Sequence, residues 1–363
     1  MRMTYTTRID KLELSNISVY SFGSDENFRA LMDEQIVTVN RKPGYTCRDK
    51  EQKHPFSKLK IVLKDSVMRK FEISANKYNP YCRMELSIQD SKWGNMQGYT
   101  VNEYKEKLRN VCKYLKEEMH IEIDASEAKI VQIEINKTIP LDGEFDAYSR
   151  PLKVMYYNSP SQYQGKADYQ TKDGKYTGYK TATYKDKVSS SYEVLKVYDK
   201  KMELKKKHIY INDNLARVEF TLVGKRRIKK ELCSNKFWEL EQENVDSFFS
   251  KRVQEIKDNC SKWKNKQFEI LLADLEKCKA DSHQWRKEYL DYLLNKELKE
   301  NLPQILHISD LYPVVKEINN QNNRKRQNLW DFKQKMNDYI SGKNHVFFID
   351  DNEKLKEIFW KLT

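Results

Sequence analysis

Short runs in which apolar and polar residues alternate dominate the first two thirds of this 363-residue chain. Alternation with a period of two is typical of β-strands, because successive side chains of a strand point to opposite faces of the sheet. The pattern predicts strands at residues 9–14, 59–63, 71–74, 83–88, 130–136, 152–157, 191–199 and 215–223. It also indicates a short helix at 26–36 and an exposed loop at 41–57, where Pro, Gly and polar residues gather.

Helical spacing replaces this alternation in two parts of the chain. Thr100 is followed three residues later by Glu103, which forms a capping box, and an apolar stripe then follows at Tyr104, Leu108, Val111, Leu115 and Met119. From about Phe237 onward the apolar residues again keep helical spacing. We therefore expect two domains, a strand-rich one at 1–235 and an α-helical C-terminal one at 236–363.

Two of the predicted strands separate an apolar face from a polar face. Strand 130–136 places Val131, Ile133 and Ile135 opposite Gln132, Glu134 and Asn136, and strand 215–223 places Val218, Phe220 and Leu222 opposite Arg217, Glu219 and Thr221. A sheet with helices on its apolar face accounts for this pattern. The predicted fold class is α+β, an antiparallel sheet with helices on one face, followed by the helical domain.

The charge of the chain narrows the class of partner. Sixty-seven Lys and Arg residues against 54 Asp and Glu give a net charge of +13, which favours a polyanion such as DNA. The six cysteines form no Cys-x-x-Cys pair and no short Cys/His motif, which argues against structural zinc and against a disulfide scaffold. No apolar signal core or membrane span stands out, so we expect a soluble cytoplasmic protein.

The stretch Ser191–Lys205 carries the most distinctive chemistry. It predicts a strand that ends at Tyr198 and runs into a charged helix start, with Lys196 on the same face as the tyrosine. If this strand shares a sheet with the strands that carry Glu134 and Glu219, the two carboxylates can bind Mg²⁺ or Mn²⁺ through oxygen ligands. Tyr198 is then a candidate nucleophile for a phosphodiester.

Cations near Tyr198 have two predicted tasks. A phenol with an ordinary pKa near 10 is a weak nucleophile, and Lys200 is the candidate that favours its phenolate form. Phosphate contacts are expected from Lys196, Arg217, Lys225, Arg226, Arg227 and Lys229. Taken singly, each feature also has an ordinary explanation, because a strand glutamate or a lysine run is usually solvated and most of the 23 tyrosines pack.

Together these residues resemble a known family. The segment EVLKVYDKKMELK at 193–205, followed by LARVEFTL at 215–222, is similar to the paired motif of rolling-circle replication initiators. The closest type is the phage and plasmid gene II/X (replication initiation factor) group, with the trans-acting plasmid Rep proteins as broader relatives. The chain departs from the HUH nucleases in having no His-hydrophobic-His motif. Acidic residues replace those histidines in the gene II/X and trans-acting Rep groups.

The resemblance implies an HUH-like nuclease domain with Tyr198 as the nicking nucleophile and Glu134 and Glu219 as metal ligands. The expected function is rolling-circle replication initiation, in which plasmid or phage origin DNA is nicked and rejoined through a covalent 5′-phosphotyrosine. The C-terminal helices would recognise the origin, form a homodimer or contact a host helicase. The alternative is a non-catalytic basic DNA-binding protein, in which Tyr198 stacks or packs.

Overall fold

The computed structural model describes residues 6–21, 23–34, 37–41, 56–63, 70–76, 79–87, 97–159, 165–170, 176–182, 191–281 and 351–363. The chain divides into two compact units. The first contains Met1–Pro140, Tyr163–Ala167 and Lys180–Lys251, and the second contains Leu141–Gln162, Asp168–Tyr179 and Arg252–Thr363. The domain boundary near residue 235 stays a prediction.

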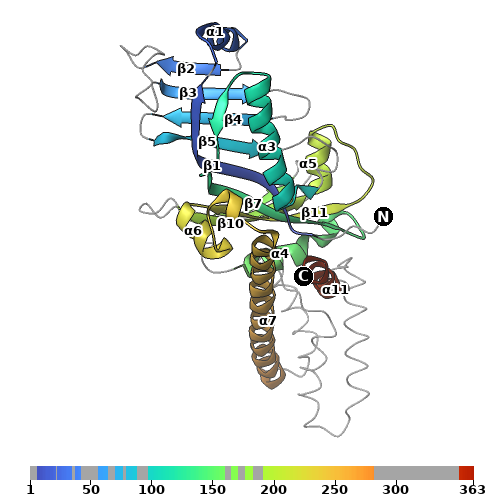
Figure 1. The fold of residues 1–363 in the computed structure, drawn as a ribbon. Helices are drawn as coiled ribbons and strands as arrows, with labels where there is room; N and C mark the ends of the chain where they lie inside the picture. The colour runs from blue at the N-terminus through green and yellow to red at the C-terminus, as the bar shows by residue number, and fades with distance from the viewer. Residues whose placement is uncertain are drawn as a thin grey trace. The chain divides into compact units, whose positions relative to one another are not determined.

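An antiparallel sheet organises the first unit (Figure 1). Its central strands are β1 (Arg8–Ser21), β7 (Lys129–Pro140), β11 (Leu215–Val223) and β10 (Tyr192–Asp199). The remaining strands are β2 (Val37–Arg41), β3 (Phe56–Leu63), β4 (Lys70–Asn76), β5 (Asn79–Ser87), β6 (Glu122–Asp124), β8 (Gly165–Gln170) and β9 (Tyr176–Ala182). The strand order is β2-β3-β4-β5-β1-β7-β11-β10-β9-β8, and β6 pairs with β1.

Helices accompany the sheet, so the predicted α+β class is confirmed. They are α1 (Asp25–Asp33), α3 (Val101–Glu117), η1 (Phe145–Tyr148), α4 (Ser149–Tyr157), α5 (Lys200–Lys206), α6 (Lys225–Leu232), η2 (Phe237–Glu239), α7 (Gln242–Asp281) and α11 (Asp351–Leu362). Among the described residues, no helix is long and apolar enough to cross a membrane. The predicted helical segments between residues 282 and 350 lie outside the described part of the chain.

Helix α3 begins as its sequence predicts. The Thr100 hydroxyl accepts a hydrogen bond from the Glu103 backbone N–H at 3.3 Å, and the Glu103 carboxylate accepts one from the Thr100 N–H at 2.6 Å. These two bonds satisfy donors that a helix N-terminus otherwise leaves unpaired. The apolar stripe of the helix is buried at Leu108, Val111 and Leu115. Figure 1 shows α3 lying across the sheet beside β1.

The apolar face of β11 lies in the core, as predicted. Val218, Phe220 and Leu222 are at most 1% exposed. The Phe220 ring meets Phe248 and Phe249, from the first turns of α7, edge to face with ring centroids 5.8 and 5.4 Å apart. Such aromatic contacts add to the burial of apolar area. This packing fixes β11 from one side and leaves its other face to the polar residues.

The prediction of a strand at 152–157 is wrong, because these residues belong to helix α4. Pro151 falls in the first turn of the helix, where its missing N–H costs nothing. Leu152, Met155 and Tyr156 are buried and lie three and four positions apart, which matches one face of a helix. The apolar run of six residues was too short to distinguish a buried helix from a strand by its period.

The second unit contains α4, α11 and most of α7. On α11, Ile358, Phe359 and Leu362 are buried. The Tyr148 hydroxyl donates to the Glu357 carboxylate at 3.0 Å, which ties η1 to α11. The site residues discussed below all belong to the first unit.

Candidate active site

Strand register brings the predicted polar residues onto one face of the sheet. Lys196 on β10 pairs with Glu219 on β11, and Tyr198 pairs with Arg217. On the other side of β11, Thr221 pairs with Glu134 of β7. Directly paired residues of antiparallel strands hold their side chains on the same face, with Cβ atoms about 5 Å apart. The three strands that sequence analysis combined are therefore adjacent, in the order β7-β11-β10.

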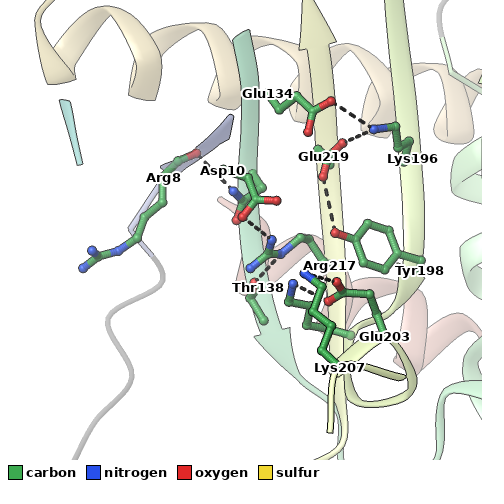
Figure 2. Close-up of polar contacts among 12 residues, drawn as sticks. Arg8, Asp10, Glu134, Thr138, Lys196, Tyr198, Glu203, Lys207, Arg217 and Glu219 are labelled. Carbon is green, nitrogen blue, oxygen red and sulfur yellow. Dashed lines mark hydrogen bonds and ion pairs between the residues drawn. The ribbon is translucent and has the colours of Figure 1, made fainter. Parts of the chain in front are cut away.

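Three carboxylates converge on this face (Figure 2). Asp10, Glu134 and Glu219 each offer one oxygen, and these three oxygens all lie within 4.8 Å of one another. Glu219 is buried, and the other two are half-buried. Asp10, on β1, is a site residue that sequence analysis missed.

Asp10 lies at a β-bulge of β1. On β1, Ile9 pairs with Ile135 and Lys11 pairs with Glu134, so two neighbouring residues of β7 face three of β1. Asp10 is the extra residue, so Asp10 and Lys11 both lie on the polar face, between Ile9 and Leu12 on the apolar face. The sequence carries the signal, since two polar residues, Asp10 and Lys11, interrupt the alternation between the buried Ile9 and Leu12.

Helix α3 and the segment before it hold the bulge in place. The Tyr104 hydroxyl donates to the Asp10 carbonyl oxygen at 2.7 Å. Tyr99 and Ile9 exchange both backbone hydrogen bonds, at 2.7 and 2.8 Å. Gly98 permits this close approach, because its φ is +83° and a Cβ there would lie 2.6 Å from the Ile9 carbonyl oxygen. The position of Asp10 thus depends on residues that do not touch the carboxylates.

This arrangement predicts the effect of Tyr104→Phe. The substitution leaves the Asp10 carbonyl without its donor, which we expect to lower the free energy of unfolding by about 1–3 kcal/mol. We also expect Mn²⁺ to bind more weakly, because Asp10 is less well held. Urea unfolding and Mn²⁺ titration measure the two effects. Tyr114→Phe, on the same helix, is the matched control, and equal behaviour of the two variants would show that the hydroxyl contact is unimportant.

Lys196 lies between two of the carboxylates. Its Nζ is 2.5 Å from Glu219 Oε1 and 3.4 Å from Glu134 Oε1. Burial alone would lower the pKa of Lys196, but the two carboxylates outweigh it and the net shift is upward. Burial and repulsion from Glu219 raise the pKa of Glu134 to about 7, against the attraction of Lys196. Lys196 therefore contacts two of the three carboxylates, Glu219 and Glu134.

Arg217 is completely buried beneath this face. Its Nη1 lies 3.0 Å from Asp10 Oδ1, and its Nε donates to the Thr138 hydroxyl at 3.0 Å. Burial raises the pKa of Asp10, but Arg217 and more distant lysines outweigh it and the net shift is downward. The placement of Arg217 suits holding Asp10 ionised rather than the phosphate contact that the sequence suggested.

Tyr198 lies half-buried at the edge of the carboxylate cluster. Its hydroxyl donates to Glu219 Oε2 at 3.3 Å. Burial raises the pKa of Tyr198 well above its usual value, and Glu219 adds to the rise while Arg217 opposes it. The direction differs from the expectation that nearby cations favour the phenolate, because burial and the carboxylates dominate. Tyr198 is a neutral phenol whose proton points to a carboxylate.

Lys200 is the first residue of α5 and is 1% exposed. Its Nζ lies 2.5 Å from Glu203 Oε2 and 6.0 Å from the centre of the Tyr198 ring, on the ring face. Burial and repulsion from Arg217 lower the pKa of Lys200 to about 8, against the attraction of Asp10 and Glu203. The predicted lysine is thus beside the tyrosine ring, although its ion-pair partner is Glu203.

The basic run after β11 forms helix α6, away from Tyr198. Lys225, Arg226 and Lys229 are exposed, whereas Arg227 pairs with the fully buried Glu193 at 2.9 Å. The helix follows the end of β11 that pairs with Tyr192, which is six residues from Tyr198, or about 20 Å along the strand. These cations can bind a polyanion but do not line the carboxylate cluster.

The residues present fit a divalent metal. Three carboxylate oxygens within 4.8 Å of one another are the donor set that Mg²⁺ and Mn²⁺ prefer. Asn136 lies on the same face and pairs with Glu219 across the ladder. It is completely buried, and its Oδ1 accepts no hydrogen bond from any described residue. An orphaned buried carbonyl oxygen beside three carboxylates is better accounted for by a cation than by the protein alone.

The fold and the site define an α+β protein with a tyrosine, a lysine and three carboxylates on one face of an antiparallel sheet. No family model and no curated protein matches the sequence. Among solved structures, a rolling circle replication initiator protein from Geobacillus stearothermophilus is similar over 61% of this chain and 75% of its own, with 14% identity and a TM-score of 0.31. The di-domain ARO/CYC BexL from the BE-7585A biosynthetic pathway matches over 68% and 95%, with 10% identity and a TM-score of 0.19. Both TM-scores are low, so the functional conclusion rests on the site itself.

Proposed function

We propose that this chain is a metal-dependent DNA nicking enzyme that starts rolling-circle replication. Tyr198 attacks one strand of a plasmid or phage origin and remains joined to the 5′ phosphate. The observation that carries the proposal is the hydrogen bond from the Tyr198 hydroxyl to Glu219, which is itself one of three converging carboxylates. A nucleophile bonded to a base beside a metal-ligand set is the arrangement that phosphodiester cleavage requires.

The proton of Tyr198 has a defined acceptor. As the phenol oxygen bonds to phosphorus, its proton passes to Glu219 Oε2, 3.3 Å away. The bond from phosphorus to the 3′ oxygen breaks, and the 3′ oxygen leaves and takes up a proton as the free hydroxyl. The phosphotyrosine ester keeps the bond energy, so the reverse step can rejoin the strand.

Asp10, Glu134 and Glu219 would hold the metal, with the Asn136 oxygen available beside them. When bound, Mg²⁺ or Mn²⁺ would supply Lewis-acid stabilisation of the charge that develops on the phosphate. Arg217 keeps Asp10 ionised through their 3.0 Å contact. Lys196, which is 29% exposed, would contact the phosphate of the DNA strand. The exposed cations of α6 would bind backbone phosphates farther along the DNA.

The proposal is tested by transfer of a label from DNA to protein. Random-sequence single-stranded oligonucleotides labelled at the 3′ end are incubated with the chain and Mn²⁺, and the products are separated under denaturing conditions. Attack by tyrosine leaves the 3′ segment on the protein, so the label moves to the protein band. We expect transfer that EDTA abolishes. Binding without transfer, at any Mn²⁺ concentration, would favour the non-catalytic DNA-binding alternative.

The metal affinity is expected to depend on pH through Glu134. Below its pKa of about 7 this carboxyl is protonated in the metal-free protein, and it must lose the proton to bind a cation. The Mn²⁺ association constant should therefore rise about tenfold per pH unit below that pKa and level off above it. Calorimetric titration measures this slope. In Glu134→Gln the affinity should be lower and the slope shallower, and an unchanged slope would remove Glu134 from the ligand set.

A further inference from the structure

The loop that joins α5 to β11 presents an aromatic ring to solvent. Tyr210 lies in this loop, residues 207–214, and is 68% exposed. A ring of this size is usually at least partly covered in a folded protein, because its apolar area is large. The Tyr210 ring therefore offers a ligand an apolar surface to cover.

Both neighbours of Tyr210 are anchored. Ile209 and Ile211 pack against the buried pair Leu204 and Leu215. The Ile209 N–H donates to the Leu204 carbonyl at 3.0 Å, and Lys201 Nζ donates to the Asn212 carbonyl at 3.1 Å. Since the chain is fixed on each side, the backbone that presents the Tyr210 ring is already ordered. A ligand that stacks on the ring would therefore have little ordering entropy to overcome.

The loop that carries Tyr210 lies at the same end of the β10–β11 hairpin as Tyr198. Lys207 pairs with Glu203 at 2.5 Å, and Glu203 pairs with Lys200, which lies over the Tyr198 ring. Tyr210 follows Lys207 by three residues, so its Cα is at most about 11 Å from that of Lys207. Lys205 and Lys206, in the last turn of α5, are exposed on the way to this loop, and Asp213 is an exposed acid within it.

We infer that Tyr210 is a stacking platform for a nucleobase of the single strand that enters the site. An exposed aromatic ring in a segment that also carries exposed lysines is a combination that binds single-stranded DNA, because bases stack on the ring and phosphates contact the cations. The inference rests on the proposed function for its ligand. It adds a contact to a base, which neither the carboxylate cluster nor α6 supplies.

The test measures binding of fluorescein-labelled oligo(dT) by anisotropy, without Mn²⁺. Tyr210→Ala should weaken binding about tenfold, since stacking of one base has an effect of this size. Tyr210→Phe should bind like the wild type, because the ring is kept. Tyr169→Ala is the matched control, since Tyr169 is another exposed tyrosine, at 48%. Equal binding by Tyr210→Ala and the wild type would overturn the inference, as would a loss in Tyr210→Phe as large as in Tyr210→Ala.

Salt dependence separates stacking from charge. The ratio of wild-type to Tyr210→Ala affinity should stay constant as salt rises, whereas Lys205→Ala should lower the slope of log K against log[salt] by about 0.7. If the ratio falls to one at high salt, the loop acts through charge alone, which would contradict stacking. Label transfer distinguishes this inference from the proposed function. If the wild-type protein binds oligo(dT) through Tyr210 but forms no adduct, the proposed nicking activity is wrong, whereas the stacking role of Tyr210 is still supported.

Discussion

In a Tyr198→Phe variant, transfer of 3′-labelled DNA to the protein is expected to fall by at least about a thousandfold, because the only change removes the attacking oxygen. Folding should be nearly unaffected, since the ring stays in place and Glu219 keeps its contact with Lys196. Denaturing gels measure the transfer, and circular dichroism with urea unfolding checks the fold.

Tyr192→Phe is the matched control for this experiment. Tyr192 lies on the same strand, six residues from Tyr198, and pairs with Val223 at the far end of the ladder. The Tyr192→Phe variant should form the adduct at the wild-type rate. A Tyr198→Phe variant that still carries the label would show that another tyrosine attacks, and the assignment of Tyr198 would be wrong.

Glu219→Gln is expected to have the second largest effect. The substitution keeps the size of the side chain but removes the charge that contacts Lys196, accepts the hydrogen bond from Tyr198 and would bind the metal. We expect adduct formation to fall by about a thousandfold and Mn²⁺ affinity by at least about tenfold. The loss of unfolding free energy should stay below the roughly 3–5 kcal/mol of a fully buried pair, because Lys196 is partly exposed.

Glu193→Gln controls for the burial of a carboxylate. Glu193 is completely buried in the neighbouring strand and pairs with Arg227, away from the cluster. It should destabilise the protein without changing Mn²⁺ affinity. If both variants lower the metal affinity equally, the effect of Glu219→Gln comes from general destabilisation and not from the site.

Much of the site follows from periodicity alone. Alternation placed Glu134, Glu219 and Tyr198 each on the polar face of its strand, and the structure brings the three strands together in adjacent positions. The capping box likewise predicted the start of α3 at Thr100. These features depend on local rules, in which a side chain's direction is set by its own strand or helix.

The residues that were missed or differently placed depend on tertiary contacts. Asp10 lies in the β1 bulge, where Tyr104 donates to its carbonyl, and its approach to Glu134 and Glu219 depends on the pairing of β1 with β7, which the β1 sequence alone does not reveal. Arg217 has a strand position that predicts a solvent-facing side chain, yet it is completely buried and contacts Asp10 and Thr138. Sequence alone cannot distinguish a cation that meets DNA from one that holds a carboxylate.

Mass spectrometry of the DNA-linked peptide tests the central claim most directly. Wild-type protein is trapped with single-stranded oligonucleotide and Mn²⁺, digested with nuclease and protease, and searched for a peptide that carries a nucleotide 5′ phosphate. The account predicts this modification on Tyr198, in the segment from Tyr192 to Lys200, and its loss when EDTA is present. A modified peptide elsewhere, or cleaved DNA with no linked peptide, would contradict it.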